Sequence, residues 1–128
     1  MRYLILSDLH ANLQALEAVL ADARTIGYDK VICLGDLVGY GADPGPVMDK
    51  ALALEPVAII RGNHDKVGAG IENVEAFNHL AKHAITWTAA ELTPNLRRLV
   101  CYEGAPAPRG QPFERDELVA QLVHLLQI

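Results

Sequence analysis

The chain of 128 residues has only two cysteines, seven aromatic residues (Tyr 4, Phe 2, Trp 1) and no excess of positive charge. Cys33 and Cys101 lack the spacing of metal ligands, which favours reduced, buried thiols in a cytoplasmic protein. The 11 basic and 16 acidic residues give a net charge of −5, which argues against binding to a nucleic-acid backbone. No apolar run approaches the ~18 residues of a membrane span, so no membrane contact is expected.

The N-terminal apolar run is typical of a strand rather than of a signal peptide, because Asp8 and His10 interrupt it too early. Further apolar runs predict strands at 30–34 and 57–60, and between them lie two segments with helical periodicity. The β-α-β-α-β order with continuous apolar strands predicts an α/β fold, a parallel sheet flanked by helices on both faces.

Capping signals bound the two predicted helices. Asn12 is a candidate N-cap for the first helix, and Gly27 is suited to close it. Asp43 as N-cap followed by Pro44 opens the second helix, which must stop before Pro56.

The pattern changes after Asp65. A loop is expected at 66–70, then a long helix at about 74–92. The apolar stripe of this helix would consist of Phe77, Leu80, Ala81, Ala84 and Thr88. We therefore expect an α/β domain over residues 1–103, a Pro/Gly-rich linker at 104–112 and a C-terminal amphipathic helix at 113–128.

Polar side chains follow each predicted strand: Asp8 and His10, then Asp36, then Asn63 and His64. The carboxyl ends of neighbouring parallel strands meet at one sheet edge, so these loops should converge within roughly 10 Å. Mixed oxygen and nitrogen donors suit Mn, Fe, Co or Zn better than Ca. The sequence thus predicts a divalent metal site.

Each motif of the predicted metal site, taken alone, also has a simpler interpretation. A Gly-Asp pair after a strand is usually a turn or a helix cap, and one Asp-x-His is a weak signal. His79 and His83 share a helix face and could bind a metal, but a solvated surface is the favoured interpretation. A Rossmann-like nucleotide binder is disfavoured because the first strand-to-helix turn lacks the Gly-x-Gly-x-x-Gly spacing.

Taken together, the motifs resemble the N-terminal half of a calcineurin-like metallophosphoesterase, in particular its small bacterial phosphodiesterase-type branch. The matching segments are Ser7-Asp8-Leu9-His10, residues 12–20, residues 34–41, Arg61-Gly62-Asn63-His64-Asp65, Phe77-Asn78 and Trp87-Thr88. The resemblance covers about residues 1–100 and implies half of a four-layer α/β/β/α sandwich with a two-metal site at one edge.

The resemblance also implies roles for single residues. Asp8 and His10 would hold the first metal, Asp36 would bridge both metals, and Asn63 would hold the second. His64 would be catalytic, protonating the leaving oxygen or stabilising the phosphoryl charge. The metals would be Mn, Fe, Ni or Zn, two in the family.

Two departures from the family pattern are visible. The family supplies further histidines, including a Gly-His-x-His motif, whereas this sequence has no Gly-His dipeptide; one bound ion, or none, is therefore expected here. Some related phosphatases carry an Asp in place of Gly39 to orient the catalytic histidine. Here that task would fall to Asp65 or to solvent.

The functional expectation is a metal-dependent phosphoesterase that hydrolyses phosphodiesters or phosphomonoesters with a metal-bridging hydroxide. The alternative is a catalytically impaired remnant that acts as a metal-binding or interaction module. A small phosphate ester is the expected substrate. Self-association into a homo-oligomer, through the tail helix or the open sheet, is also expected, because an uncovered sheet face and edge favour it.

Overall fold

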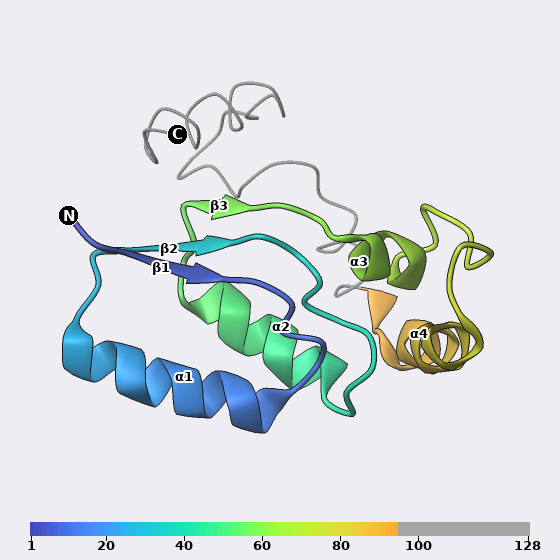
Figure 1. The fold of residues 1–128 in the computed structure, drawn as a ribbon, viewed down its shortest axis with the longest axis horizontal. Helices are drawn as coiled ribbons and strands as arrows, with labels where there is room; N and C mark the ends of the chain where they lie inside the picture. Colours follow the sequence, from blue (N-terminus) through green and yellow to red (C-terminus); the bar gives the residue numbers. More distant parts are fainter. Residues whose placement is uncertain (95–128) are drawn as a thin grey trace.

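The computed structural model describes residues 1–94, so the expected linker and C-terminal helix, with Cys101, lie outside the described residues. Strands and helices alternate through most of this part of the chain (Figure 1). In order they are β1 (Tyr3–Leu6), α1 (Leu13–Ile26), β2 (Lys30–Cys33), α2 (Pro44–Ala53), β3 (Ala58–Ile59), α3 (Asn63–Gly68) and α4 (His79–Glu91). No helix among residues 1–94 is both long and apolar enough to cross a membrane.

The three strands form a parallel sheet in the order β1-β2-β3, which confirms the predicted α/β fold. The expectation of helices on both faces is wrong for the described residues, because α1 and α2 lie against the same face (Figure 1). The strand order explains this arrangement. Successive crossovers that advance in one direction with the same hand place their helices on one side of the sheet.

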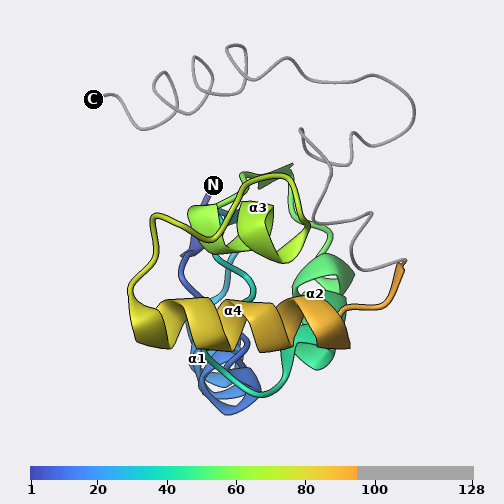
Figure 2. The same ribbon diagram turned by 90° about the vertical axis from the view of Figure 1, so that its right-hand side faces the viewer.

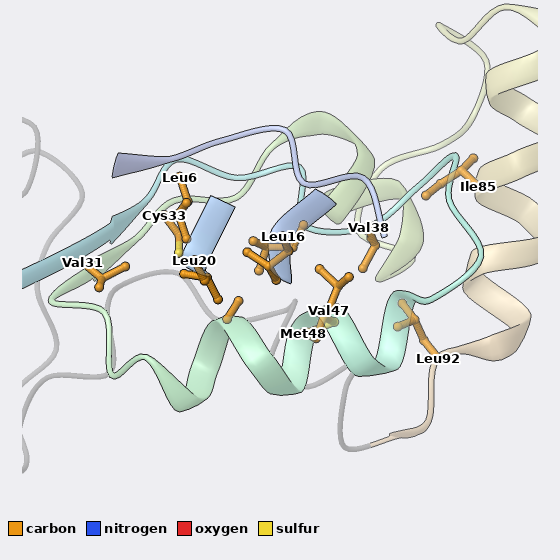
Figure 3. Packing of buried hydrophobic residues seen from close by; sticks show 12 residues of the cluster. Leu6, Leu16, Leu20, Val31, Cys33, Val38, Val47, Met48, Ile85 and Leu92 are labelled. Carbon is orange, nitrogen blue, oxygen red and sulfur yellow. The ribbon is translucent and has the colours of Figure 1, made fainter. Parts of the chain in front are cut away.

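The main core lies between this sheet face and the two helices (Figure 3). Cys33 of β2, Leu16 of α1 and Met48 of α2 are almost fully buried in it. Burying a Leu or Met side chain contributes about 1.5–3 kcal/mol, so this layer holds the strands in register over the helices. On the opposite sheet face, Ile32 and Ala58 form a second small apolar cluster.

The helix ends follow the predicted signals in all but one case. The side-chain oxygen of Asn12 accepts a hydrogen bond from the backbone N–H of Ala15 at 3.0 Å, and Gly27 follows the last residue of α1. Helix α2 begins at Pro44 as expected, but Asp43 makes no side-chain capping bond. The N1 proline has no N–H that needs an acceptor, and its fixed φ suits the first turn of the helix.

The segment after β3 differs from the prediction. Residues 63–68 form α3 where a loop was expected from residue 66, and α4 begins at His79 rather than near residue 74. Asn78 accepts a hydrogen bond from the N–H of Ala81 and so fixes the start of α4. The predicted apolar stripe is also partly wrong, since Leu80 is 77% exposed and Ile85 is buried. Both helices lie beyond the carboxyl ends of the strands (Figures 1 and 2).

Candidate metal centre at the strand ends

The loops after β1 and β2 continue side by side past the end of the sheet. The backbone N–H of Asp8 donates to the carbonyl oxygen of Gly35 at 3.0 Å. The N–H of His10 donates to the oxygen of Asp36, and that of Ala11 to Leu37, both at 2.9 Å. These bonds hold the first two predicted donor loops in a fixed relation to each other.

The same loops contain unusual backbone conformations. Five non-glycine residues have positive φ: Asp8 (55°), His10 (46°), Ala11 (54°), Asp36 (50°) and Tyr40 (61°). Left-handed backbone costs an L-residue roughly 1–2 kcal/mol and persists only where the surroundings enforce it. Such strain clusters at functional sites, and here three of the five residues are predicted metal ligands.

The structure brings the first three predicted ligands together. One donor atom from each of Asp8, His10 and Asp36 lies within 4.8 Å of the others. The Nδ1 of His10 is 3.2 Å from the carbonyl oxygen of Val38, which fits the tautomer that leaves Nε2 free for a cation. That Nε2 atom lies 3.7 Å from Oδ1 of Asp8. Two carboxylates and one imidazole form a donor set that fits a transition-series divalent cation.

The third loop reaches the same place through α3. The N–H of His64 donates to Oδ1 of Asp36 at 2.9 Å. Gly62 comes so close that an added Cβ would lie 2.0 Å from the same oxygen, so only glycine fits there. Asn63 is the exposed first residue of α3, directly after this contact. Its role as a ligand stays a prediction, as do the roles inferred for the other four site residues.

His64 lies in an aromatic environment and is only 5% exposed. Its ring stacks on Phe77, with centroids 4.6 Å apart and an interplanar angle of 25°. The rings of Tyr40 and His10 lie 4.7 and 4.8 Å away. Burial lowers the pKa of His64, against the opposing influence of the Asp36 carboxylate, and so favours the neutral imidazole.

Asp65 has a structural role that sequence reasoning missed. Asp65 or solvent was expected to orient His64, but the Asp65 carboxylate accepts hydrogen bonds from the backbone N–H groups of Leu37, Val38 and Gly62. Burial raises the pKa of Asp65, although these three donors act in the opposite sense. The sequence feature that could have indicated this role is the position of Asp65 as the third residue of a helix, where an acidic side chain can cap the helix start.

His79 and His83 are both exposed on α4, in agreement with the favoured interpretation of a solvated surface. Neither belongs to a group of three or more potential metal-ligating residues among residues 1–94. The candidate centre therefore consists of the loops after the three strands.

A parallel α/β sheet with carboxylate and imidazole donors gathered at its carboxyl edge defines an α/β protein with a candidate divalent-metal centre. The chain belongs to the calcineurin-like phosphoesterase family, whose model matches residues 1–126. The match thus extends beyond the residues 1–100 covered by the recognised motifs. It confirms the resemblance drawn from those motifs.

Two similar proteins support this assignment. An uncharacterized protein of Methanocaldococcus jannaschii (MJ0912) is 43% identical over 84 residues, which are 66% of this chain and 34% of that protein. The crystal structure of a metallophosphoesterase from Sphaerobacter thermophilus matches with a TM-score of 0.64 and 40% sequence identity. The match covers 78% of this chain and 40% of that one. The chain therefore spans less than half the length of these relatives.

A third protein shares the fold at lower identity. The crystal structure of a "putative diadenosine tetraphosphatase" matches with a TM-score of 0.62 at 22% identity, covering 80% of this chain and 43% of that one. At this identity the likeness concerns the fold alone.

Proposed function

We propose that the protein is a metal-dependent phosphoesterase that hydrolyses phosphodiesters or small phosphomonoesters. The observation that carries the proposal is the convergence of donor atoms from Asp8, His10 and Asp36 within 4.8 Å, in a member of a phosphoesterase family. Mn, Fe, Ni or Zn would suit this mixture of carboxylate and imidazole ligands.

Each residue of the centre has a task in this proposal. When bound, divalent cations neutralise phosphoryl oxygens and lower the pKa of a water molecule. Asp8 and Asp36 supply negative charge that offsets the cation, and Val38 holds the ring of His10 through its carbonyl oxygen. Asn63 offers an amide oxygen from the exposed start of α3.

The reaction needs a proton at the leaving oxygen. One P–O bond forms to the oxygen of water, which releases a proton to solvent, while the P–O bond to the alcohol breaks and the departing oxygen takes up a proton. His64 in its protonated form is the proposed donor, because its backbone N–H is hydrogen-bonded to Asp36 and its ring lies beside that of His10. Burial lowers the pKa of His64 and so disfavours this form, whereas the Asp36 carboxylate favours it. A positioned acid of this kind contributes roughly 10²–10⁴-fold to a rate.

The test is hydrolysis of bis-p-nitrophenyl phosphate with added Mn²⁺. Asp36→Asn should lower the rate by more than about 10²-fold, because losing a ligand exceeds the 10–100-fold effect of losing an outer partner. Asp49→Asn, on the exposed surface of α2, is the matched control and should keep the wild-type rate. Equal rates for the wild type and Asp36→Asn would reject the proposal.

A non-catalytic metal-binding or interaction module is the alternative. It is favoured by the small size of the cluster, which has three His, Cys, Asp or Glu donors in the described part of the chain. Calorimetry distinguishes the two functions. Binding of Mn²⁺ that disappears in Asp36→Asn, without turnover of any phosphate ester, would support the module.

A further inference from the structure

We propose that Phe77 is a positioning residue that orients the imidazole of His64 by ring stacking. The inference rests on the proposed function, since orientation of this ring matters only where His64 acts on a substrate. It adds to the site a residue from the segment between α3 and α4, outside the three loops that follow the strands.

No hydrogen bond at Nδ1 holds the ring of His64 among the described residues, although this atom is buried. The nearby carboxylate of Asp65 accepts from three backbone N–H groups and is engaged there. Because this nitrogen has no partner to direct it, packing against neighbouring groups orients that side of the imidazole.

Among the rings that contact His64, Phe77 is the one that covers its face. The two rings are inclined by 25°, whereas Tyr40 is tilted by 43° and His10 stands nearly edge-on at 74°. The centroid distance of 4.6 Å lies within the range in which aromatic pairs attract each other beyond the effect of their buried area. The stack therefore restricts rotation of the imidazole about its side-chain bonds.

The backbone of Gly39 limits the edge of the same ring. A Cβ at this position would lie 2.4 Å from Nδ1 and 3.0 Å from Cγ of His64, and the φ of +92° also favours glycine. The imidazole thus approaches the main chain as closely as sterics allow. Gly39 at the edge and Phe77 on the face leave little freedom for the ring.

Phe77 is itself held in place by its own segment. Its N–H donates to the carbonyl oxygen of Val74 at 3.1 Å, and its side chain packs against the main core. The next residue, Asn78, caps α4. The position of the stack therefore depends on where α4 begins.

Steady-state kinetics with Mn²⁺ on a phosphate ester that has an alkyl leaving group test the role, because a departing alkoxide needs a proton whereas p-nitrophenolate leaves without one. Phe77→Leu removes the planar ring and should lower kcat by about 10- to 100-fold, the range expected for a misplaced catalytic group, with little change in KM. Phe77→Tyr keeps the ring and should restore most of kcat. Val74→Ala is the matched control, since it trims a partly buried side chain of the same segment without removing the stack.

A double variant separates positioning from general destabilisation. If Phe77 acts through His64, Phe77→Leu should have no further effect on kcat in a His64→Gln background. An equal loss of kcat in both backgrounds would overturn the inference, as would full activity of Phe77→Leu.

Proton NMR of the metal-free protein gives a readout independent of turnover. The ring current of Phe77 should shift the carbon-bound ring protons of His64 upfield in the wild type and in Phe77→Tyr, and this shift should disappear in Phe77→Leu. Unchanged His64 signals in Phe77→Leu would overturn the inference even if catalysis is observed. A wild type without any turnover would instead reject the proposed function.

Discussion

Asp65 is the buried carboxylate on which the second and third loops of the site converge. Its Oδ1 accepts from Leu37 and Val38 at 2.9 and 3.2 Å, and its Oδ2 accepts from Gly62 at 3.0 Å. Each of these donors would lose its partner if the side chain changed. This residue therefore joins the two loops that carry Asp36 and His64.

Asp65→Asn should lower the free energy of unfolding by about 1–3 kcal/mol, the cost of leaving one buried donor unsatisfied. The amide group of asparagine can replace one carboxylate oxygen but turns an N–H donor toward another N–H. Urea unfolding of the full chain measures the change, with Asp22→Asn on the exposed face of α1 as control. Equal stability of Asp65→Asn and the wild type would contradict this role.

The buried thiol of Cys33 makes the free energy of unfolding fall at alkaline pH. The side chain is fully buried, and burial, followed by the charge of Asp65, raises the pKa of its thiol from 9.0 to about 11. Between these values the unfolded chain has already released the proton that the folded chain retains. The free energy of unfolding therefore falls as pH rises through this window.

We expect this thiol to remove about 2 kcal/mol of stability between about pH 9 and about pH 11. The measurement is urea unfolding of the wild type and of Cys33→Ala across this range. The comparison is needed because lysine and tyrosine side chains titrate in the same range. The two stability curves should converge as pH rises, and curves that stay parallel would show that the thiol is not responsible.

At the scale of elements, the start of α4 is decided by one capping residue. Helical periodicity alone extends back to residue 74, but the oxygen of Asn78 accepts the N–H of Ala81 at 3.0 Å and begins the helix there. The residues before Asn78 therefore lie outside the helix, and among them Phe77 stacks on His64. Local capping thus sets the geometry of the candidate site.

Asn78→Ala should destabilise the protein by about 1 kcal/mol, as is typical for the loss of an N-cap. Thermal unfolding followed by circular dichroism measures the effect. Thr86→Ala, exposed in the same helix, is the control and should leave stability unchanged or slightly higher. A loss in the control as large as in Asn78→Ala would show that the cap is not the cause.

At the scale of the molecule, the two faces of the sheet differ in their cover. Helices α1 and α2 pack on one face, whereas Ile5 is 43% exposed and lies in register with Ile32 of the opposite face. Paired residues of neighbouring strands share a face, so this second face is apolar and partly accessible. We propose this face as the surface of self-association, the tail helix being the alternative.

Ile5→Lys should shift a homo-oligomer of the chain toward monomer, because a lysine charge cannot be desolvated cheaply in such a contact. Light scattering over a range of protein concentrations measures the change. Leu80→Lys, at a site 77% exposed on α4, is the control and should leave association unchanged. A stable monomer of the wild type would contradict the expectation.

Much of this architecture could be predicted from local signals. The strands follow from short apolar runs, and α1 follows from the cap at Asn12 and from Gly27. The donor cluster follows from topology, because parallel strands bring Asp8 and Asp36 to one edge. These predictions succeed because the deciding interactions lie within a few residues or repeat along a strand.

The sequence by itself determined the parallel order of elements and the meeting of Asp8, His10 and Asp36 at the strand ends. Only the tertiary structure decided that Asp65 ties the loops instead of orienting His64, and that Phe77 stacks on that ring. Each contact joins two residues that lie far apart along the chain. Their choice among competing neighbours depends on packing and on the pairing of buried polar groups, which no local pattern encodes.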